Sequence, residues 1–137
     1  MKKLAPLLIV LSGIMIAGCS QASPANTSGT PYQDISPETL AEMMENRRDT
    51  FILVNTHIPY EGDIPGTDLS IPYNEITENL ELLPADKDAE IVLYCLSDSM
   101  SRSAAEDLAD LGYTNLKNLD GGFIAWRDAG YPFEIEP

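Results

Sequence analysis

Cysteine, histidine and basic residues are all scarce in this chain of 137 residues. It has two cysteines and one histidine, and its 8 lysines and arginines stand against 22 acidic residues, for a formal net charge of −14. One histidine and isolated cysteines do not form a metal site by their spacing, so the sequence predicts no metal and no cofactor. So acidic a surface repels nucleic acid. The length allows one folded domain.

The first eighteen residues have the pattern of a secretory signal. Lys2 and Lys3 precede an apolar run at 7–16 that is too short to cross a bilayer comfortably. The run ends in Ile-Ala-Gly-Cys at Cys19, which resembles the lipobox of bacterial-type lipoproteins, where the cysteine sulfur carries diacylglycerol. We therefore expect 1–18 to be a signal peptide and Cys19 to anchor the protein on the extracytoplasmic face of a membrane. An ordinary signal peptide and an uncleaved transmembrane helix are the alternatives.

The segment 19–33 is rich in Ser, Pro, Thr, Gly and Asn and has no hydrophobic periodicity, which is typical of a flexible tether. The remainder, 34–137, is predicted to be the folded domain. Cleavage of the signal would leave six basic residues against 22 acidic ones, a formal charge of −16. With Cys19 lipidated, Cys95 is the only thiol and no disulfide can form within the chain. A lone thiol outside the cytoplasm is expected to be buried or functional.

Short apolar runs alternate with helical patterns along the predicted domain. We expect buried strands at 51–54, 91–94 and 116–119, and a short extended piece at 69–72. Helices are expected at 36–46, 74–82, 101–111 and after the glycine pair at 121–122; Ser36 is the N-cap of the first helix and Pro37 its first residue. This alternation predicts an α/β fold with a parallel sheet and helices on both faces. Ligands of such sheets lie beyond the carboxyl ends of the strands.

Cys95 stands at the carboxyl end of the predicted strand 91–94. The loop from Leu96 to Ser101 curls into a helix, and such a loop aims backbone amides at its own centre. Those dipoles would stabilise a thiolate, which is a nucleophile able to carry a terminal sulfur. On this local pattern alone, a buried cysteine that packs as a small apolar residue is an equally good interpretation.

Several segments together resemble the rhodanese-like domain family. The first is Leu93-Tyr94-Cys95 with the loop and helix that follow, and the second is Asn-Leu-Asp-Gly-Gly-Phe-Ile-Ala-Trp at 118–126. The predicted strand 51–55 corresponds to a family strand that ends in Asp-Val-Arg. The turn 64–67 corresponds to the family turn His-Ile-Pro-Gly-Ala. The resemblance covers about 35–132 and implies a rhodanese-like parallel sheet of about five strands.

The resemblance also implies a sulfurtransferase or a sulfur carrier. A sulfane donor such as thiosulfate, or a protein-bound donor, would leave its outer sulfur on Cys95 as a persulfide, which then passes to a thiol or to an exported protein. The residues that would cradle this sulfur are Leu96, Ser97, Asp98, Ser99, Met100 and Ser101. Trp126 and the glycines before it are interpreted as packing residues.

The cysteine loop departs from the family pattern. Arg commonly follows the cysteine directly, with Gly at the third position and Arg at the fifth; this chain has Leu96, Asp98 and Met100 there. Asp can accept the left-handed backbone that Gly supplies, so Asp98 is compatible with the geometry of the loop. Its charge should destabilise a thiolate and repel thiosulfate, so weak turnover of anionic donors is predicted, with a gain in Asp98→Gly. Phosphatase relatives need an arginine where Ser101 stands, so phosphate ester hydrolysis is not expected.

Other candidates remain around the loop. Arg102 is interpreted as facing solvent or an acidic partner, and His57 as a surface loop residue near the site; the alternative for His57 is a Cys–His pair with thiol protease or acyl transfer chemistry. Tyr60 and Glu61 could line the same mouth. The competing function is a catalytically weak rhodanese-like binding module that docks a protein partner. A redox thiol would need a resolving partner that the chain lacks.

Overall fold

A computed structural model describes residues 29–135 of the chain. The predicted signal peptide, the lipidated Cys19 and most of the predicted tether lie outside the described residues. Between residues 29 and 135, no helix is long and apolar enough to cross a bilayer.

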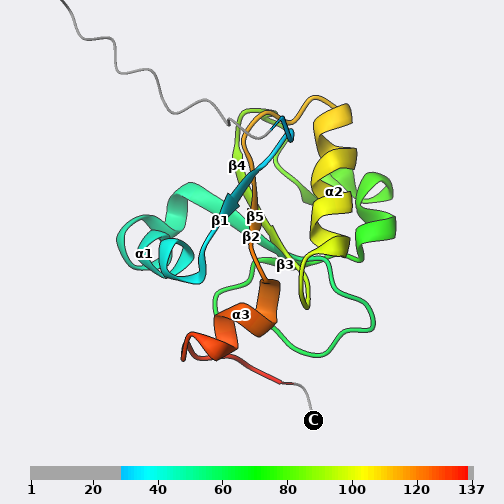
Figure 1. The fold of residues 1–137 in the computed structure, drawn as a ribbon. Coiled ribbons are helices and arrows are strands. Elements are labelled where there is room, and N and C mark those ends of the chain that lie inside the picture. The colour runs from blue at the N-terminus through cyan, green and yellow to red at the C-terminus, as the bar shows by residue number, and fades with distance from the viewer. Residues whose placement is uncertain (1–28, 136–137) are drawn as a thin grey trace, which may run out of the picture.

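The centre of the fold is one sheet in which all pairs of neighbouring strands are parallel (Figure 1). Its strands are β1 (Gln33–Ile35), β2 (Phe51–Asn55), β3 (Leu69–Ser70), β4 (Glu90–Tyr94) and β5 (Leu116–Leu119), in the spatial order β1-β5-β4-β2-β3. The five-stranded parallel sheet confirms the predicted fold class. The order places β4 in the middle, so its carboxyl end has a strand on either side.

Three α-helices and three 3-10 helices connect the strands. They are α1 (Pro37–Arg47), η1 (Arg48–Thr50), η2 (Tyr73–Glu78), η3 (Leu80–Leu82), α2 (Ser99–Asp110) and α3 (Gly122–Asp128). The predicted start of α1 is confirmed, because the hydroxyl oxygen of Ser36 accepts a hydrogen bond from Thr39 N at 3.2 Å. The single helix expected at 74–82 is wrong: Asn79, with φ −119° and ψ 32°, divides it into η2 and η3.

Helices cover both faces of the sheet, as predicted; α2 and α1 lie on opposite sides in Figure 1. Because side chains of a strand alternate between faces, β4 serves both cores. Leu93 packs with α2 and η2, whereas Val92 and Tyr94 pack with α1 and α3. Tyr32, placed in the tether by the sequence, is 6% exposed and belongs to the core under α2. The folded structure therefore reaches upstream of β1.

Candidate active site

Cys95 follows the central strand β4 directly, at the edge of the sheet where the sequence predicts a ligand. Its exposed fraction is 2%, and it is a free cysteine. It lines a small pocket together with Asn55, His57, Glu61, Gly62, Tyr94, Leu96 and Phe123. The pocket has a volume of about 10 Å³, which is room for roughly one water-sized sphere. Cys95 thus borders space for about one added atom, while a whole donor molecule would have to bind at the mouth.

The loop after Cys95 offers hydrogen-bond donors that the protein does not use. Within residues 29–135, none of the backbone N–H groups from Leu96 to Ser101 donates to a protein acceptor. The first amide of this region with an acceptor is that of Arg102, which donates to Asp98 O at 3.0 Å. Unpaired amides of this kind are normal at the first turn of a helix, where they favour negative charge.

The first turn of α3 holds the cysteine loop from the other side. Phe123 N donates to Cys95 O at 2.8 Å and Ile124 N donates to Leu96 O at 3.0 Å. Gly122 makes this approach possible: it has φ +58°, and a Cβ there would lie 2.5 Å from Cys95 O and 2.7 Å from Ser97 O. A side chain at this position would push the helix off the loop.

Trp126 has the packing role expected of it. Its side chain is 3% exposed, it stacks on Tyr131 with ring centroids 4.5 Å apart, and its indole N–H donates to Pro132 O at 2.8 Å.

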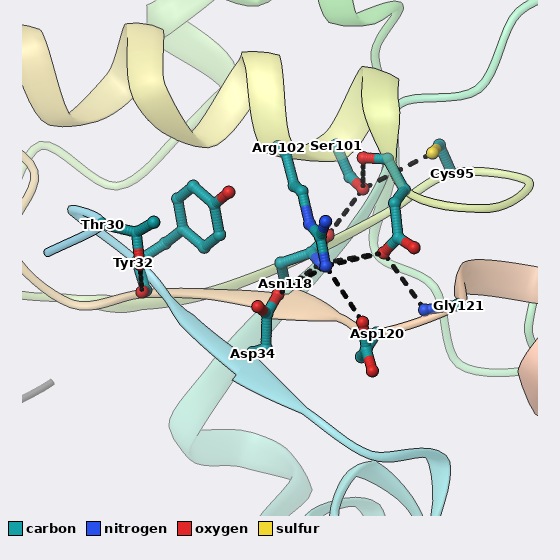
Figure 2. A network of polar contacts seen from close by, with 10 residues as sticks. Thr30, Tyr32, Asp34, Cys95, Ser101, Arg102, Asn118, Asp120 and Gly121 are labelled. Carbon is teal, nitrogen blue, oxygen red and sulfur yellow. Dashed lines mark hydrogen bonds and ion pairs between the residues drawn. The ribbon is translucent and has the colours of Figure 1, made fainter. Parts of the chain in front are cut away.

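A buried hydroxyl lies next to the sulfur (Figure 2). Ser101 Oγ is 3.4 Å from Cys95 Sγ, 3.0 Å from Asp98 O and 2.6 Å from Asn118 Oδ1. A hydroxyl carries one proton, so Ser101 donates to one of these three acceptors at a time. Sequence reasoning missed Asn118, because β5 (Leu-Lys-Asn-Leu) has no clear alternation and Lys117 beside it is also polar.

Asp98 does not point at the thiol. Its Oδ1 accepts from Gly121 N at 3.1 Å and from Asn118 Nδ2 at 3.2 Å, and it lies 3.5 Å from the guanidinium of Arg102. Asp98 does not use the left-handed backbone that Asp can accept, because its φ is −160°. The physical reason is that α2 begins at Ser99, two residues before its predicted start, so Asp98 is the residue before the helix, which takes an extended φ.

Arg102 is surrounded by carboxylates, as expected for a paired arginine (Figure 2). Its NH2 lies 3.0 Å from Asp120, 3.5 Å from Asp34 and 3.5 Å from Asp98. Partial burial would lower the pKa of Arg102, but the charges of Asp98 and Asp34 outweigh it and raise that pKa. The guanidinium therefore stays charged and offsets part of the negative charge of these three carboxylates, and it does not line the pocket.

The interpretation of His57 as a surface loop residue is wrong. Its side chain is 11% exposed, it lines the pocket with Cys95, and its Nε2 lies 2.6 Å from Glu61 Oε2. The cause is Asn55, whose Oδ1 accepts from His57 N at 3.0 Å and turns the chain inward after β2. Glu61 lines the pocket as suggested. Tyr60 is not among the lining residues and donates from its hydroxyl to Asp63 at 2.7 Å.

Tyr94 lines the pocket and connects β4 to the loop after His57 through hydrogen bonds. Burial raises the pKa of Tyr94, so its phenol stays protonated at neutral pH. Its hydroxyl donates to Asp63 Oδ1 at 3.1 Å and accepts from Ile64 N at 3.0 Å. The loop that follows His57 is thereby tied to the end of β4. In the described part of the chain, no group of three or more His, Cys, Asp and Glu side chains is arranged to hold a metal ion.

Comparison with known proteins agrees with this architecture. The model of the rhodanese-like domain family matches residues 36–129. A sulfurtransferase of Allochromatium vinosum is 34% identical over 102 residues, covering 72% of this chain and 92% of that protein. Thiosulfate sulfurtransferase 18 of Arabidopsis thaliana is 31% identical over 119 residues, covering 85% and 81%.

Other matches are partial or structural. The chain spans about half, 54%, of an uncharacterized protein of Synechocystis sp. that is 33% identical over 100 residues, covering 72% of this chain. The crystal structure of a rhodanese-related protein from Thermoplasma volcanium superposes with a TM-score of 0.64 at 26% identity, covering 77% of this chain and 100% of that chain.

Proposed function

The chain belongs to the rhodanese-like domain family, and from that premise we propose that it carries sulfane sulfur on Cys95 as a persulfide and transfers it to a thiol acceptor. Its distant homologues include thiosulfate sulfurtransferases. The observation that carries the proposal is a thiol at the end of the central strand that faces a pocket of one-atom size.

The proposed reaction has two steps at one sulfur. The Cys95 sulfur attacks the outer sulfur of the donor, the bond between that sulfur and the rest of the donor breaks, and its electron pair leaves with the donor. An acceptor thiolate then attacks the outer sulfur of the persulfide and releases the Cys95 thiolate. The pocket gives room for the added sulfur, and the unused amides from Leu96 to Ser101 would stabilise its charge.

The charges around the loop favour a neutral or protein-bound donor over thiosulfate. Leu96 and Met100 supply no positive charge where family members commonly have arginine, and Arg102 is engaged by three carboxylates. The whole chain carries a formal charge of −14, which repels a dianion at long range.

Intact-mass measurement tests the proposal. The protein is incubated with thiosulfate or with a neutral dialkyl trisulfide. Thiosulfate should add one sulfur atom to the wild type and release sulfite. The trisulfide should add its central sulfur together with one alkylthio group and release one alkanethiolate, and this reaction should be the faster one. Neither adduct should form in Cys95→Ser. The sulfur should leave the protein when a small thiol is added. An adduct that persists in Cys95→Ser would place the chemistry elsewhere.

A non-enzymatic binding module is the second candidate, because the thiol is only 2% exposed and the surface nearby is acidic. That surface consists of Asp34, Asp98 and Asp120, whose side chains are 44%, 29% and 62% exposed. No sulfur adduct with either donor, in a folded protein, would favour this second function.

We also propose that the protein is anchored on the extracytoplasmic face of a membrane through lipid on Cys19. The support is the lipobox-like sequence that ends at this residue. Incorporation of an alkynyl fatty acid during growth, visible in the wild type and lost in Cys19→Ser, is the expected result. Labelling that survives this substitution would contradict the anchor.

A further inference from the structure

His57 lines the pocket but has no part in the two proposed steps. It is the only histidine of the chain, and it lines the same small pocket as Cys95. Among the residues that line this pocket, His57 is the only side chain able to carry a positive charge.

The contact with Glu61 fixes the position of the imidazole proton. The 2.6 Å separation between Nε2 and the Glu61 carboxylate is a hydrogen bond only if Nε2 carries the proton, because two acceptors at that distance repel each other. In the neutral ring, the other nitrogen then has no proton and is a lone-pair acceptor.

That other nitrogen, Nδ1, is buried and has no hydrogen-bond partner in the described part of the chain. A buried acceptor without a donor destabilises the fold, and such atoms are rare enough to need an explanation. The surrounding structure holds the ring in place all the same: His57 N is bound by Asn55, and Asn55 Nδ2 donates to Gly62 O at 3.0 Å and to Asp63 Oδ1 at 2.9 Å.

We propose that His57 is the general base of the pocket, with its proton on Nε2 fixed by Glu61. This inference rests on the proposed function. No hydrogen bond joins the Cys95 thiol to His57 Nδ1 directly, so in the loading step the thiol proton passes to Nδ1 through one water molecule in the pocket. The freed electron pair on Sγ forms the S–S bond with the outer sulfur of the donor. The bond from that sulfur to the rest of the donor breaks, and its electron pair leaves as sulfite or as a thiolate.

The proton retained on His57 has a second consequence. The imidazolium faces a pocket that then holds the anionic persulfide, so it supplies the positive charge that the loop lacks. The negative charge of Glu61 on its far side stabilises the imidazolium in turn, in the order nucleophile, base, carboxylate.

The reaction of Cys95 with methyl methanethiosulfonate tests the assignment separately from sulfur carriage. This small neutral reagent gives a methyl disulfide on Cys95 and releases methanesulfinate, with the thiol proton going to the base. We expect His57→Ala to react about a hundredfold more slowly than the wild type at neutral pH, as is typical of losing a general base. Added imidazole should restore a large part of the rate and reach saturation. Glu61→Gln should slow the reaction less than His57→Ala.

Tyr60→Phe is the matched control, because it removes a hydrogen bond of the same loop without touching the pocket, and it should react at the wild-type rate. A wild-type rate in His57→Ala would overturn the proposal. So would a slow rate that imidazole leaves unchanged, since that marks a structural role. Failure of sulfur loading in the mass experiment, with a normal methyl disulfide reaction, would instead overturn the proposed function.

Discussion

The hydroxyl oxygen of Ser101 lies 3.4 Å from the sulfur of Cys95 and 2.6 Å from the amide oxygen of Asn118 (Figure 2). Both polar side chains are fully buried. The first contact couples α2 to Cys95, and the second couples α2 to β5. When the sulfur is neutral, the serine proton is best placed on Asn118; when the sulfur is charged, the same proton can turn toward it.

Replacement of Ser101 by alanine should therefore affect stability and reactivity together. It leaves Asn118 Oδ1 without its donor in a buried place, which lowers the free energy of unfolding by about 1–3 kcal/mol. It also removes a donor to the thiolate, so Cys95 should be modified more slowly. Urea unfolding and the rate of thiol modification measure the two effects. Ser103→Ala, in the same helix but outside this network, should change neither.

Gly122→Ala should lower the free energy of unfolding by more than the strain of a left-handed backbone angle alone. A left-handed conformation is unfavourable by about 1–2 kcal/mol for a residue with a Cβ. At Gly122 that Cβ would also collide with Cys95 O and Ser97 O, whereas at Gly130, with φ +87°, it would meet nothing within 4 Å. Gly130→Ala thus isolates the cost of the angle.

We expect Gly122→Ala to lose more stability than Gly130→Ala in urea unfolding, and to change the reactivity of Cys95 because α3 can no longer hold its carbonyl. Equal losses in the two variants would show that the close approach of α3 to the loop is unimportant.

The sequence was sufficient for strands β2, β4 and β5 and for the position of Cys95 at the end of β4. The continuous apolar runs at 51–54 and 91–94 identify buried strands by composition, and Cys95 follows the second run. The strand β1 was not predicted, because only Ile35 of its three residues is apolar and its pairing with β5 is a long-range contact.

The surroundings of the thiol depend on the directions of individual side chains, which the apolar pattern of the strands does not indicate. The inward turn of His57 depends on a hydrogen bond from its own N–H to the Asn55 side chain. The direction of the Asp98 carboxylate depends on Gly121 and Asn118, twenty or more residues away. Residue type alone therefore predicted a charge near the sulfur but not its orientation.

Asp98→Asn tests the effect of this charge on donor choice. The asparagine oxygen can still accept from Gly121 N, so the substitution removes the charge and keeps that hydrogen bond. We expect thiosulfate-dependent transfer to rise about threefold to tenfold, because loss of one nearby charge at a protein surface is worth about 1 kcal/mol. Transfer from a neutral trisulfide should stay the same. A rise with both donors would point to altered loop structure. The gain expected in Asp98→Gly should be smaller, since glycine also loses the contacts to Gly121 and Asn118.

Glu90 should make stability depend on pH in the acid range. Its carboxylate lies 2.5 Å from Arg47 and 3.1 Å from Lys117, with 12% of its side chain exposed. Burial alone would raise the pKa of Glu90, but hydrogen bonds from Arg47 and Lys117 outweigh it and hold that pKa below the ordinary value of 4.5. A carboxyl group whose pKa is lower in the folded state stabilises the fold above its unfolded pKa. That stabilisation is lost as the pH falls from 4.5 through the lower folded pKa.

The free energy of unfolding of Glu90→Gln should accordingly lie below that of the wild type at neutral pH, and the two should converge as the pH falls below 4.5. Denaturant unfolding at a series of pH values measures this difference. Glu45→Gln, an exposed position on α1 outside these ion pairs, should follow the wild type at every pH. If the difference in free energy of unfolding between Glu90→Gln and the wild type stayed constant into strong acid, it would come from side-chain packing and not from the charge of Glu90. In that case, the ion pairs at the start of β4 would not contribute to the stability of the strand that precedes Cys95.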